Sequence, residues 1–375
     1  MIVENINKIN PVSRVLIVPL DWGLGHATRC IPIINELTRL NIEVIIAGEG
    51  DIPKILGKTQ PNLVFLRLKG YQVKYSRSRK FFFVKILQQA PKIIRAINHE
   101  RKWLKKTITT YKIDAVISDN RFGLHHRQIK SIFITHQLSI QTGNKWIDKL
   151  AQKINYYFIN KFDECWVPDA AGDPNLAGKL SHPNQFPLIP VKYLGVLSRF
   201  KRTVIEKKYE LLIMLSGPEP QRSIFENILL SQLKNIDGSI VLVRGLPGEE
   251  KRLQIENDQL IIHNHLPTGS LNELILQSKN IVARCGYSTV MDLVTLQQKA
   301  ILVPTPGQTE QEYLAIHLME NKFFYTCSQE NFSLKASLET VKHFNFAATG
   351  DIPGIYPAVI SNWIERSRYH VTVQQ

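Results

Sequence analysis

The feature that most constrains this chain is a repeated alternation of short, β-branched apolar runs with longer amphipathic stretches. Runs rich in Val and Ile indicate strands, and apolar residues spaced three or four apart indicate helices. Strands that alternate with helices build parallel sheets covered by helices on both faces. With 375 residues, the chain is also too long for one core of ordinary size. The sequence therefore predicts an α/β protein of two Rossmann-like, doubly wound domains that face a central cleft.

The first series of strands and helices lies between residues 15 and 167. Pro91 predicts a break in its longest helix, because proline cannot donate a helical hydrogen bond. The expected strands are Val15–Pro19, Glu43–Ala47, Val64–Leu66, Ala115–Ser118, Ile132–Thr135 and Cys165–Val167, and the expected helices are Ala27–Leu40, Phe81–Thr110 and Lys145–Asn160.

A polar, basic stretch at residues 199–209 predicts the linker between the domains, with a first domain at 1–198 and a second at 210–375. A second series follows this linker, and residues 353–368 are expected to form a last helix of the second domain. The expected strands are Leu211–Leu215, Ile240–Val243, Leu260–Ile262, Asn280–Ala283 and Ala300–Val303, with helices near 222–234, 270–277, 288–296 and 311–320.

Positive charge is concentrated in one stretch of the chain. The net charge is +15, and the segment from Arg67 to Lys106 has thirteen Lys and Arg against Glu100 alone, a net of +12. Phe81–Phe83 follow several of these cations, a pattern typical of a segment that docks on an anionic membrane surface. The alternative is a core-facing helix whose lysines are solvated. No RNA-binding or helix-turn-helix motif accompanies the charge, so we expect no nucleic-acid partner.

The sequence contains no uncharged apolar run of the ~18 residues needed for a membrane-spanning helix, and the first residues lack a signal-peptide pattern. The four cysteines form no ligand-like cluster, so we expect them to be reduced and buried. These features predict a cytoplasmic protein, which would be peripheral on the inner face of the membrane if the basic stretch docks there.

The sharpest motif connects the first strand to the first helix and reads Leu-Asp-Trp-Gly-Leu-Gly-His over residues 20–26. Gly23 and Gly25 let backbone amides approach a ligand, and the helix N-terminus that follows favours an anion. The motif is not the dinucleotide fingerprint, because Thr28 holds the third glycine position. His26 can hydrogen-bond a substrate oxygen or accept a proton, and its alternative role is a helix cap or a packed ring.

Small and hydroxyl-bearing residues follow two strands of the second half. Ser216 and Gly217 form one small loop suited to phosphate. Gly286, Ser288 and Thr289 open a helix, and a helix N-terminus with glycine and hydroxyls is a geometry that binds anions. We expect these loops to bind the phosphates of a ligand.

Carboxylate and amide side chains follow on the same elements. Asp292, about one turn inside the helix, can bind two ribose hydroxyls or simply compensate the helix dipole. Gln311 and Glu312 follow a loop at 304–307 that contains two prolines and a glycine. Their side chains offer donors and acceptors to sugar hydroxyls, and the alternative is a helix start capped by Thr309.

The order of these motifs resembles glycosyltransferase family 28, the group typified by the N-acetylglucosaminyltransferase that forms lipid II for peptidoglycan. The matching segments are GLGHATR at 23–29, SGP at 216–218, ARCGYSTVMDL at 283–293 and PTPGQTEQEY at 304–313. The resemblance extends over about residues 15–325. It implies the two-domain GT-B fold, a UDP-sugar donor held mainly by the second domain, and an acceptor held by the first.

The resemblance also implies roles for single residues. Asp292 takes the place of a ribose-binding glutamate, and Gln311 and Glu312 match a pair of glutamines that reads the donor sugar. Arg199 matches an arginine near the nucleotide at the domain junction. The positions matched to the phosphate-binding loops are Gly23, Gly25, His26, Ser216, Gly217 and Thr289.

Departures from the family pattern bear on both substrates. Glu312 stands where the family has a glutamine and Ala315 where it has an asparagine, which argues against N-acetylglucosamine as the donor sugar. The loop at 118–123 replaces a glycine-rich stretch, and His136 only partly matches a family motif, so lipid I is not the expected acceptor. We expect a lipid-linked or glycan acceptor beside His136 and Arg121.

The expected reaction is a single inverting displacement at the anomeric carbon without a metal ion or cofactor, because fixed dipoles can stabilise the leaving diphosphate. Asp119, at the end of a first-domain strand, is our first choice for the base, and His26 is the second. Two alternatives remain open. One is a UDP-sugar hydrolase like that of pseudaminic acid synthesis, and the other is a nonenzymatic, membrane-bound subunit that binds a nucleotide sugar.

Overall fold

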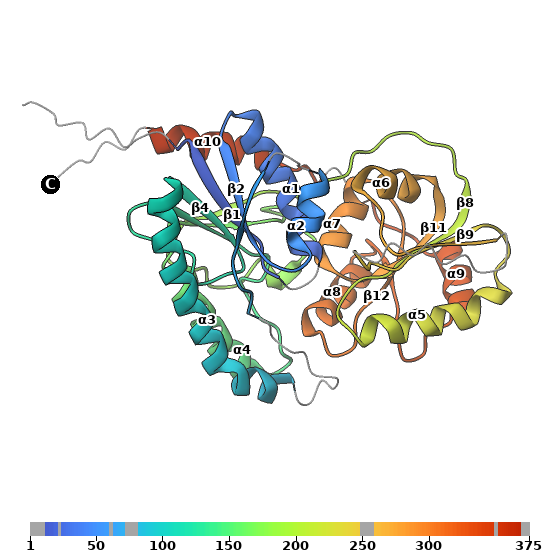
Figure 1. Ribbon diagram of the computed structural model, residues 1–375. Helices are drawn as coiled ribbons and strands as arrows, with labels where there is room; N and C mark the ends of the chain where they lie inside the picture. Colours follow the sequence, from blue (N-terminus) through green and yellow to red (C-terminus); the bar gives the residue numbers. More distant parts are fainter. Residues whose placement is uncertain are drawn as a thin grey trace, which may run out of the picture.

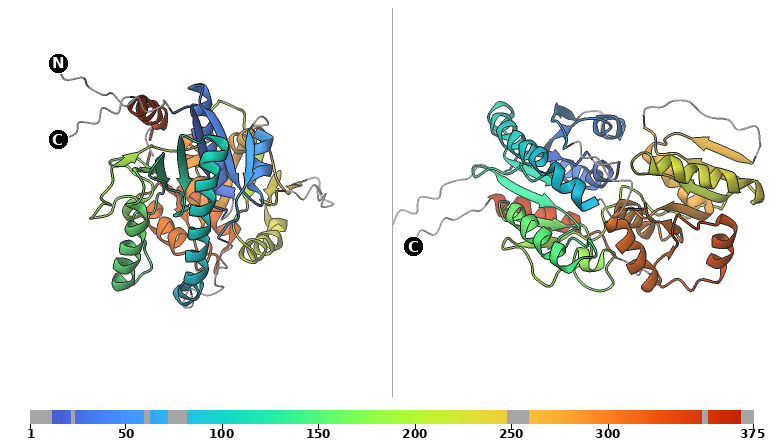
Figure 2. Two further views of the ribbon diagram at one scale, coloured as in Figure 1. Left: turned by 60° about the vertical axis from the view of Figure 1, so that its left-hand side comes forward. Right: turned by 90° about the horizontal axis from the view of Figure 1, so that it is seen from below.

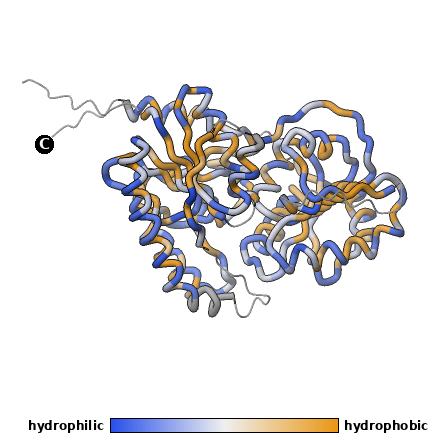
Figure 3. The backbone as a smooth tube through the Cα atoms, viewed as in Figure 1, coloured by the Kyte–Doolittle hydropathy of each residue, from blue (hydrophilic) through white to orange (hydrophobic). Residues whose placement is uncertain are grey.

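The computed structural model describes residues 12–21, 24–59, 63–71, 82–247, 259–348 and 352–368. These residues form two α/β domains that lie side by side (Figure 1). Apolar backbone segments are concentrated in the strands of both domains, and hydrophilic segments cover the outer helices (Figure 3). The predicted fold class is therefore confirmed. Gly23 and residues 72–81 lie outside the described ranges.

The first domain contains a seven-stranded parallel sheet in the order β3-β2-β1-β4-β5-β6-β7. Its central strands are buried on both faces, which explains their continuous apolar sequences. The last strand was not predicted, because three half-buried residues carry little periodicity. The strands are β1 (Arg14–Val18), β2 (Glu43–Gly48), β3 (Val64–Arg67), β4 (Ala115–Asp119), β5 (Lys130–Ile134), β6 (Glu164–Val167) and β7 (Val191–Tyr193).

The helices of this domain are α1 (Leu24–Arg39), α2 (Ile52–Thr59), α3 (Phe82–Tyr111) and α4 (Lys145–Ile159). The expected break at Pro91 does not occur, and α3 continues through this residue. Proline removes one backbone donor, and the neighbouring turns keep their own hydrogen bonds. Both α3 and α4 extend beyond the sheet in the same direction (Figure 2). None of the helices within the described ranges is long and apolar enough to cross a bilayer.

The second domain contains a six-stranded parallel sheet in the order β10-β9-β8-β11-β12-β13. The chain enters it at β8 after residues 198–208, which form no helix or strand. Its strands are β8 (Tyr209–Met214), β9 (Ile240–Val243), β10 (Leu260–His263), β11 (Ser278–Arg284), β12 (Ile301–Val303) and β13 (Tyr325–Thr326), and its helices are α5 (Gln221–Gln232), α6 (Thr268–Gln277), α7 (Tyr287–Thr295), α8 (Thr309–Glu320) and α9 (Leu334–His343).

The last helix, α10 (Tyr356–Arg368), returns to the first domain, although the sequence analysis places it in the second. The indole of Trp363 meets that of Trp166 edge-on, with ring centroids 5.4 Å apart. Arg366 also pairs with Glu164 on β6 at 3.0 Å. Gly195 has φ +68°, and a Cβ there would lie 1.8 Å from the carbonyl oxygen of Pro353. The segment that precedes α10 therefore contacts the first domain so closely that position 195 requires glycine.

The strand orders place a switch point in each domain. In the first sheet the winding reverses between the adjacent strands β1 and β4, and in the second it reverses between β8 and β11. Ligands of doubly wound folds bind beyond the carboxyl ends of the strands at such points. The motifs at residues 20–26 and 216–218 follow β1 and β8, and Asp119 and Arg284 end β4 and β11.

Candidate active site in the interdomain cleft

His26 and Asp119 meet at the switch point of the first domain. His26 is the third residue of α1, and Asp119 is the last residue of β4. Nδ1 of His26 lies 3.0 Å from Oδ2 of Asp119. The histidine side chain is 16% exposed, whereas the carboxylate is fully buried. The histidine is therefore the member of the pair that can reach a ligand.

Arg29, one turn further along α1, neutralises Asp119. Its Nε donates to Oδ2 of Asp119 at 2.9 Å, and its Nη2 pairs with Oδ1. Burial by itself would raise the pKa of Asp119, but the charge of Arg29 and then that of His26 hold this pKa at about 2. Both carboxylate oxygens are engaged and the pKa of Asp119 is low, so this geometry favours His26 over Asp119, our first choice, as the base.

The environment of His26 keeps its imidazole neutral. Burial, followed by the nearby charge of Arg29, lowers the pKa of His26 below its ordinary value. Arg29 also approaches Nδ1 at 2.8 Å. The contact with Oδ2 of Asp119 suits an Nδ1 that carries the hydrogen, whereas the contact with Arg29 suits an Nδ1 that accepts one. The tautomer with hydrogen on Nδ1 leaves the lone pair of Nε2 available to accept a proton.

A second histidine connects this cluster to the other domain. Nδ1 of His136 lies 3.2 Å from Nη1 of Arg29, and its Nε2 lies 2.7 Å from Oε1 of Glu310. Gln137 donates to the second oxygen of Glu310. The His136 ring stacks on Tyr287 of α7, with centroids 4.3 Å apart. The sequence analysis missed Glu310, although it lies inside the matched segment 304–313.

Arg121, which the sequence analysis expects on the acceptor side, is engaged in a buried ion pair. Its side chain is fully buried, and its Nε donates to Oε1 of Glu100 on α3 at 2.7 Å. Nη2 donates to the backbone oxygen of Lys69 at 2.6 Å. The hydroxyl of Tyr71 donates to the second oxygen of Glu100 at 3.0 Å. Arg121 and Glu100 thus form a buried ion pair that connects α3 to the segments after β3 and β4.

The second switch point presents the two predicted small loops. Gly217 has φ +99°, a left-handed conformation that favours glycine, and it follows Ser216 after β8. Gly286 is the N-cap of α7, so Ser288 and Thr289 lie in the first turn of that helix. The Ser288 hydroxyl donates to the backbone oxygen of Gly25 in the first domain at 3.1 Å. The residues of these two loops therefore lie at the switch point of the second domain, and Gly25 lies at that of the first.

Thr305 and Arg284 adjoin these loops and were missed by the sequence analysis. Oγ1 of Thr305 is buried without a hydrogen-bond partner among the described residues, and it would lie 3.8 Å from a Cβ added at Gly217. Arg284 donates to the backbone oxygen of Gln221 at 2.7 Å, and within the described ranges it pairs with no carboxylate. Burial lowers its pKa to about 9. A buried cation without a counter-ion favours an anionic ligand nearby.

Asp292 and Arg199 lie at the domain junction. The hydroxyl of Ser198 donates to Oδ1 of Asp292 at 2.5 Å. Burial raises the pKa of Asp292 to about 6, and Arg199 offsets part of this effect. Nε of Arg199 is buried and has no hydrogen-bond partner among the described residues. This pair can therefore offer a carboxylate acceptor and a guanidinium donor to a polar ligand.

The side chains of Gln311 and Glu312 turn back to their own loop. Oε1 of Gln311 accepts the N–H of Thr305, and Oε1 of Glu312 accepts the N–H of Gly307, each at 2.9 Å. Both residues therefore fix the loop before α8. Glu310 is the carboxylate of this segment that contacts the first domain.

Comparisons with known proteins agree with the two-domain fold. Residues 231–346 match the profile described as the glycosyltransferase family 28 C-terminal domain. No curated protein is similar enough in sequence to match the chain.

Several solved structures share the fold. CalG4, the calicheamicin glycosyltransferase, is 11% identical with a TM-score of 0.62, covering 96% of this chain and 98% of that one. MurG of Acinetobacter baumannii is 14% identical with a TM-score of 0.53, covering 94% and 99%. SsfS6 of Streptomyces sp. SF2575, solved with thymidine diphosphate, is 14% identical with a TM-score of 0.57, covering 94% and 99%. At these identities the likeness shows the two-domain fold.

Proposed function

We propose that the chain is a glycosyltransferase of family 28, with the GT-B fold, that transfers the sugar of a UDP-sugar to a lipid-linked or glycan acceptor. The observation that carries this proposal is the juxtaposition of the two switch points. A neutral histidine lies on one side and two phosphate-sized loops on the other, and the hydrogen bond between Ser288 and Gly25 connects them. The groups proposed for deprotonation and for leaving-group binding thus lie where the two domains meet.

The donor is proposed to bind mainly to the second domain. Asp292 would accept the ribose hydroxyls, with Arg199 beside the nucleotide. The diphosphate would lie between the Ser216–Gly217 loop and the N-terminus of α7, where backbone amides and the helix dipole favour negative charge. The Thr305 hydroxyl and the Arg284 charge, which have no hydrogen-bond partner and no carboxylate partner, respectively, within the described ranges, lie beside those loops and support the same placement.

The proposed reaction is one inverting displacement. The acceptor hydroxyl attacks the anomeric carbon, Nε2 of His26 takes the hydroxyl proton, and the bond to the diphosphate breaks with its electron pair leaving on the diphosphate oxygen. Asp119 acts as a positioning residue, since it fixes the Nδ1 tautomer and stabilises the imidazolium that forms. The α7 N-terminus stabilises the charge on the leaving group, so the scheme requires no metal ion or cofactor.

An exposed stripe on α4 supports a membrane-associated acceptor. Trp146 is 82% exposed, Leu150 54%, Ile154 52% and Tyr157 62%, and their spacing places them along one side of the helix. The lysines of the same helix flank this stripe, which is complementary to anionic lipid. We name Trp146, Leu150, Ile154 and Tyr157 the α4 stripe. The sequence analysis expected Phe81–Phe83 to dock on the membrane instead, and the structure does not describe the side chains of these residues.

The α4 stripe lies on a helix that extends from the first domain, the domain assigned to the acceptor (Figure 2). We propose that it docks the enzyme on the cytoplasmic face of an anionic membrane, where a lipid-linked acceptor is located. Each nearby lysine would add about 1 kcal/mol to that attachment.

UDP release from UDP-sugars tests the proposed function when it is measured with and without a lipid extract. A transferase needs the extract and places the sugar on an extracted lipid. Equal UDP release without the extract would indicate a hydrolase, and no turnover under either condition would indicate a binding subunit. His26→Ala is the matched catalytic control.

A further inference from the structure

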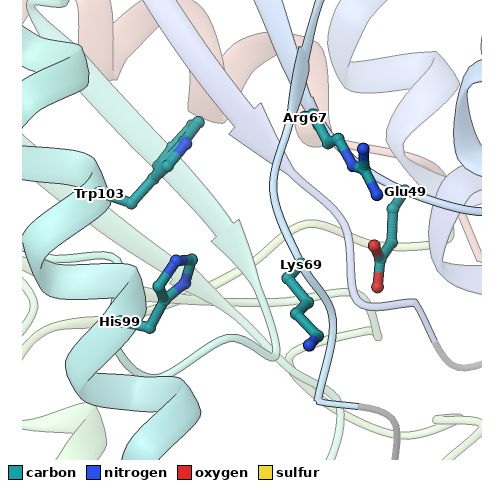
Figure 4. A pocket seen from close by; sticks show the side chains of 5 residues that line it. All are labelled: Glu49, Arg67, Lys69, His99 and Trp103. Carbon is teal, nitrogen blue, oxygen red and sulfur yellow. The ribbon is translucent and has the colours of Figure 1, made fainter.

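A cationic pocket lies on the first domain, apart from the donor loops. Its volume is about 470 Å³, within the range of small-molecule sites. His99 and Trp103 of α3 form one wall, and Arg67 at the end of β3 and Lys69 just after it form the opposite wall (Figure 4). Glu49, just after β2, completes the lining. The pocket lies at the carboxyl ends of β2 and β3, so it opens at the same edge of the sheet as His26.

The side chains that line this pocket carry a net positive charge that can bind a ligand. Among the described residues, no side chain forms a hydrogen bond or ion pair with Arg67, Lys69 or His99. The carboxylate of Glu49 accepts the N–H of Gly70 at 2.8 Å, so one of its oxygens is engaged with the pocket wall. Two permanent cations therefore face a cavity that contains one carboxylate, and an anion is the complementary ligand.

The wall formed by residues 67–71 is held in place by buried contacts. Nη2 of Arg121 donates to the backbone oxygen of Lys69, and the Arg121 side chain is fixed by its ion pair with Glu100 on α3. The two walls of the pocket are thus connected by one buried ion pair. This preorganisation lowers the entropic cost of binding a ligand between them.

The same wall is connected to the active-site loop. Oδ1 of Asp21 accepts the N–H of Tyr71 at 3.3 Å. A Cβ added at Gly70 would lie 1.9 Å from the Asp21 carboxylate, so glycine permits this close approach. Asp21 begins the short segment that leads to His26. The wall of the pocket is therefore bonded to Asp21, five residues before the proposed base His26.

We propose that this pocket binds the phosphorylated part of a saccharide acceptor. Arg67 and Lys69 would bind the phosphate, since a guanidinium matches phosphate oxygens in a bidentate geometry and an ammonium adds a point charge. The half-buried ring of Trp103 would pack against the apolar face of a sugar. The assignment of this ligand as the acceptor rests on the proposed function, whereas the binding of a phosphosaccharide does not.

Calorimetry with glucose 1-phosphate tests this proposal, with saturating UDP present to occupy the donor site. The wild type should bind glucose 1-phosphate, and unphosphorylated glucose should bind at least tenfold more weakly. The double variant Arg67→Gln/Lys69→Gln should bind glucose 1-phosphate at least tenfold more weakly than the wild type. Lys105→Gln removes an exposed cation of α3 that does not line the pocket, and this variant should bind as the wild type does.

Tryptophan fluorescence gives an independent readout at the pocket. Glucose 1-phosphate should change the emission of the wild type, and Trp103→Phe should abolish that change while the other tryptophans remain. The proposal is overturned if the wild type does not bind glucose 1-phosphate, or if the Arg67→Gln/Lys69→Gln variant binds it equally well. It is also overturned if that variant loses attachment to phosphatidylglycerol vesicles, because the cations would then bind a lipid headgroup.

The outcomes separate this inference from the proposed function. If glucose 1-phosphate binding depends on Arg67 and Lys69 but no sugar transfer is observed, the pocket assignment stands and the transferase proposal fails. If transfer occurs and glucose 1-phosphate does not bind, the pocket assignment fails alone.

Discussion

Oε1 of Glu310, in the first turn of α8, lies 2.7 Å from Nε2 of His136, which follows β5 in the other domain. His136 also contacts Arg29, which pairs with Asp119. One polar network therefore extends from Glu310 in the second domain to the end of β4 in the first. Burial opposes ionisation of Glu310, but His136 and then His26 and Arg29 lower its pKa below the ordinary value. A charged carboxylate thus connects the second domain to the first.

Glu310→Ala should open the cleft in the absence of ligand, because it removes the acceptor for His136 and Gln137. We expect a larger radius of gyration by small-angle X-ray scattering and a change in UDP affinity below threefold, since Asp292 and the phosphate loops are untouched. Glu320→Ala, at the exposed end of the same helix, is the control. Scattering curves that coincide for wild type and Glu310→Ala would contradict the link.

His26→Ala should lower turnover by about 10²- to 10⁴-fold, the usual effect of losing a general base, with little change in stability. Asp119→Asn should instead destabilise the fold by about 3 kcal/mol, because it leaves the buried charge of Arg29 uncompensated. Chemical denaturation and turnover measured on both variants distinguish these roles. Full activity in His26→Ala would remove this residue from the mechanism.

The pH dependence of kcat/KM should show an acid limb with a midpoint below 6.5, the ordinary pKa of histidine. The base acts as the neutral imidazole, and burial and Arg29 favour that form, so activity should persist to lower pH than for an unperturbed histidine. A midpoint above 6.5 would show that another group is the base.

Asp292→Asn should weaken UDP binding by about 1.5 to 3 kcal/mol, the range for hydrogen bonds to a charged group. The same change should stabilise the ligand-free protein at pH 7. Because the pKa of Asp292 is raised to about 6 in the folded state, ionisation costs stability as the pH rises from about 4 to 6, by up to about 3 kcal/mol. Calorimetry with UDP and thermal melts at pH 5 and pH 7 measure both effects. A stabilising effect equal at both pH values would contradict the titration.

Changes in the α4 stripe should release the protein from anionic vesicles. Trp146→Ser/Leu150→Ser should reduce co-sedimentation with phosphatidylglycerol vesicles at least tenfold, since it removes two exposed apolar anchors. Val204→Ser/Ile316→Ser, which changes exposed apolar residues elsewhere, should pellet as the wild type does. A second variant, with Arg77, Arg79 and Lys80 changed to Glu and Phe82 to Ser, tests whether the basic segment from Arg67 to Lys106 attaches the protein to vesicles. If the wild type does not pellet at moderate salt, the membrane proposal fails.

The sequence by itself determined most of the strands and helices and the loops expected to carry chemistry. These features depend on local periodicity and on glycine and hydroxyl residues at strand ends, so they are visible without tertiary contacts. The loops at Gly25, Ser216 and Gly286 accordingly lie at the two switch points, because the order of strands and helices limits where such loops can lie.

The tertiary structure alone decided which side chains meet. Asp119 is neutralised by Arg29 and Arg121 by Glu100, in each case through residues far apart in sequence, so no local pattern distinguishes a base from a buried ion pair. The choice of Glu310 over Gln311 as the residue that crosses the cleft also depends on side-chain direction at the start of α8. Burial and long-range pairing set the charge state of each group, and these arise when the two domains pack together.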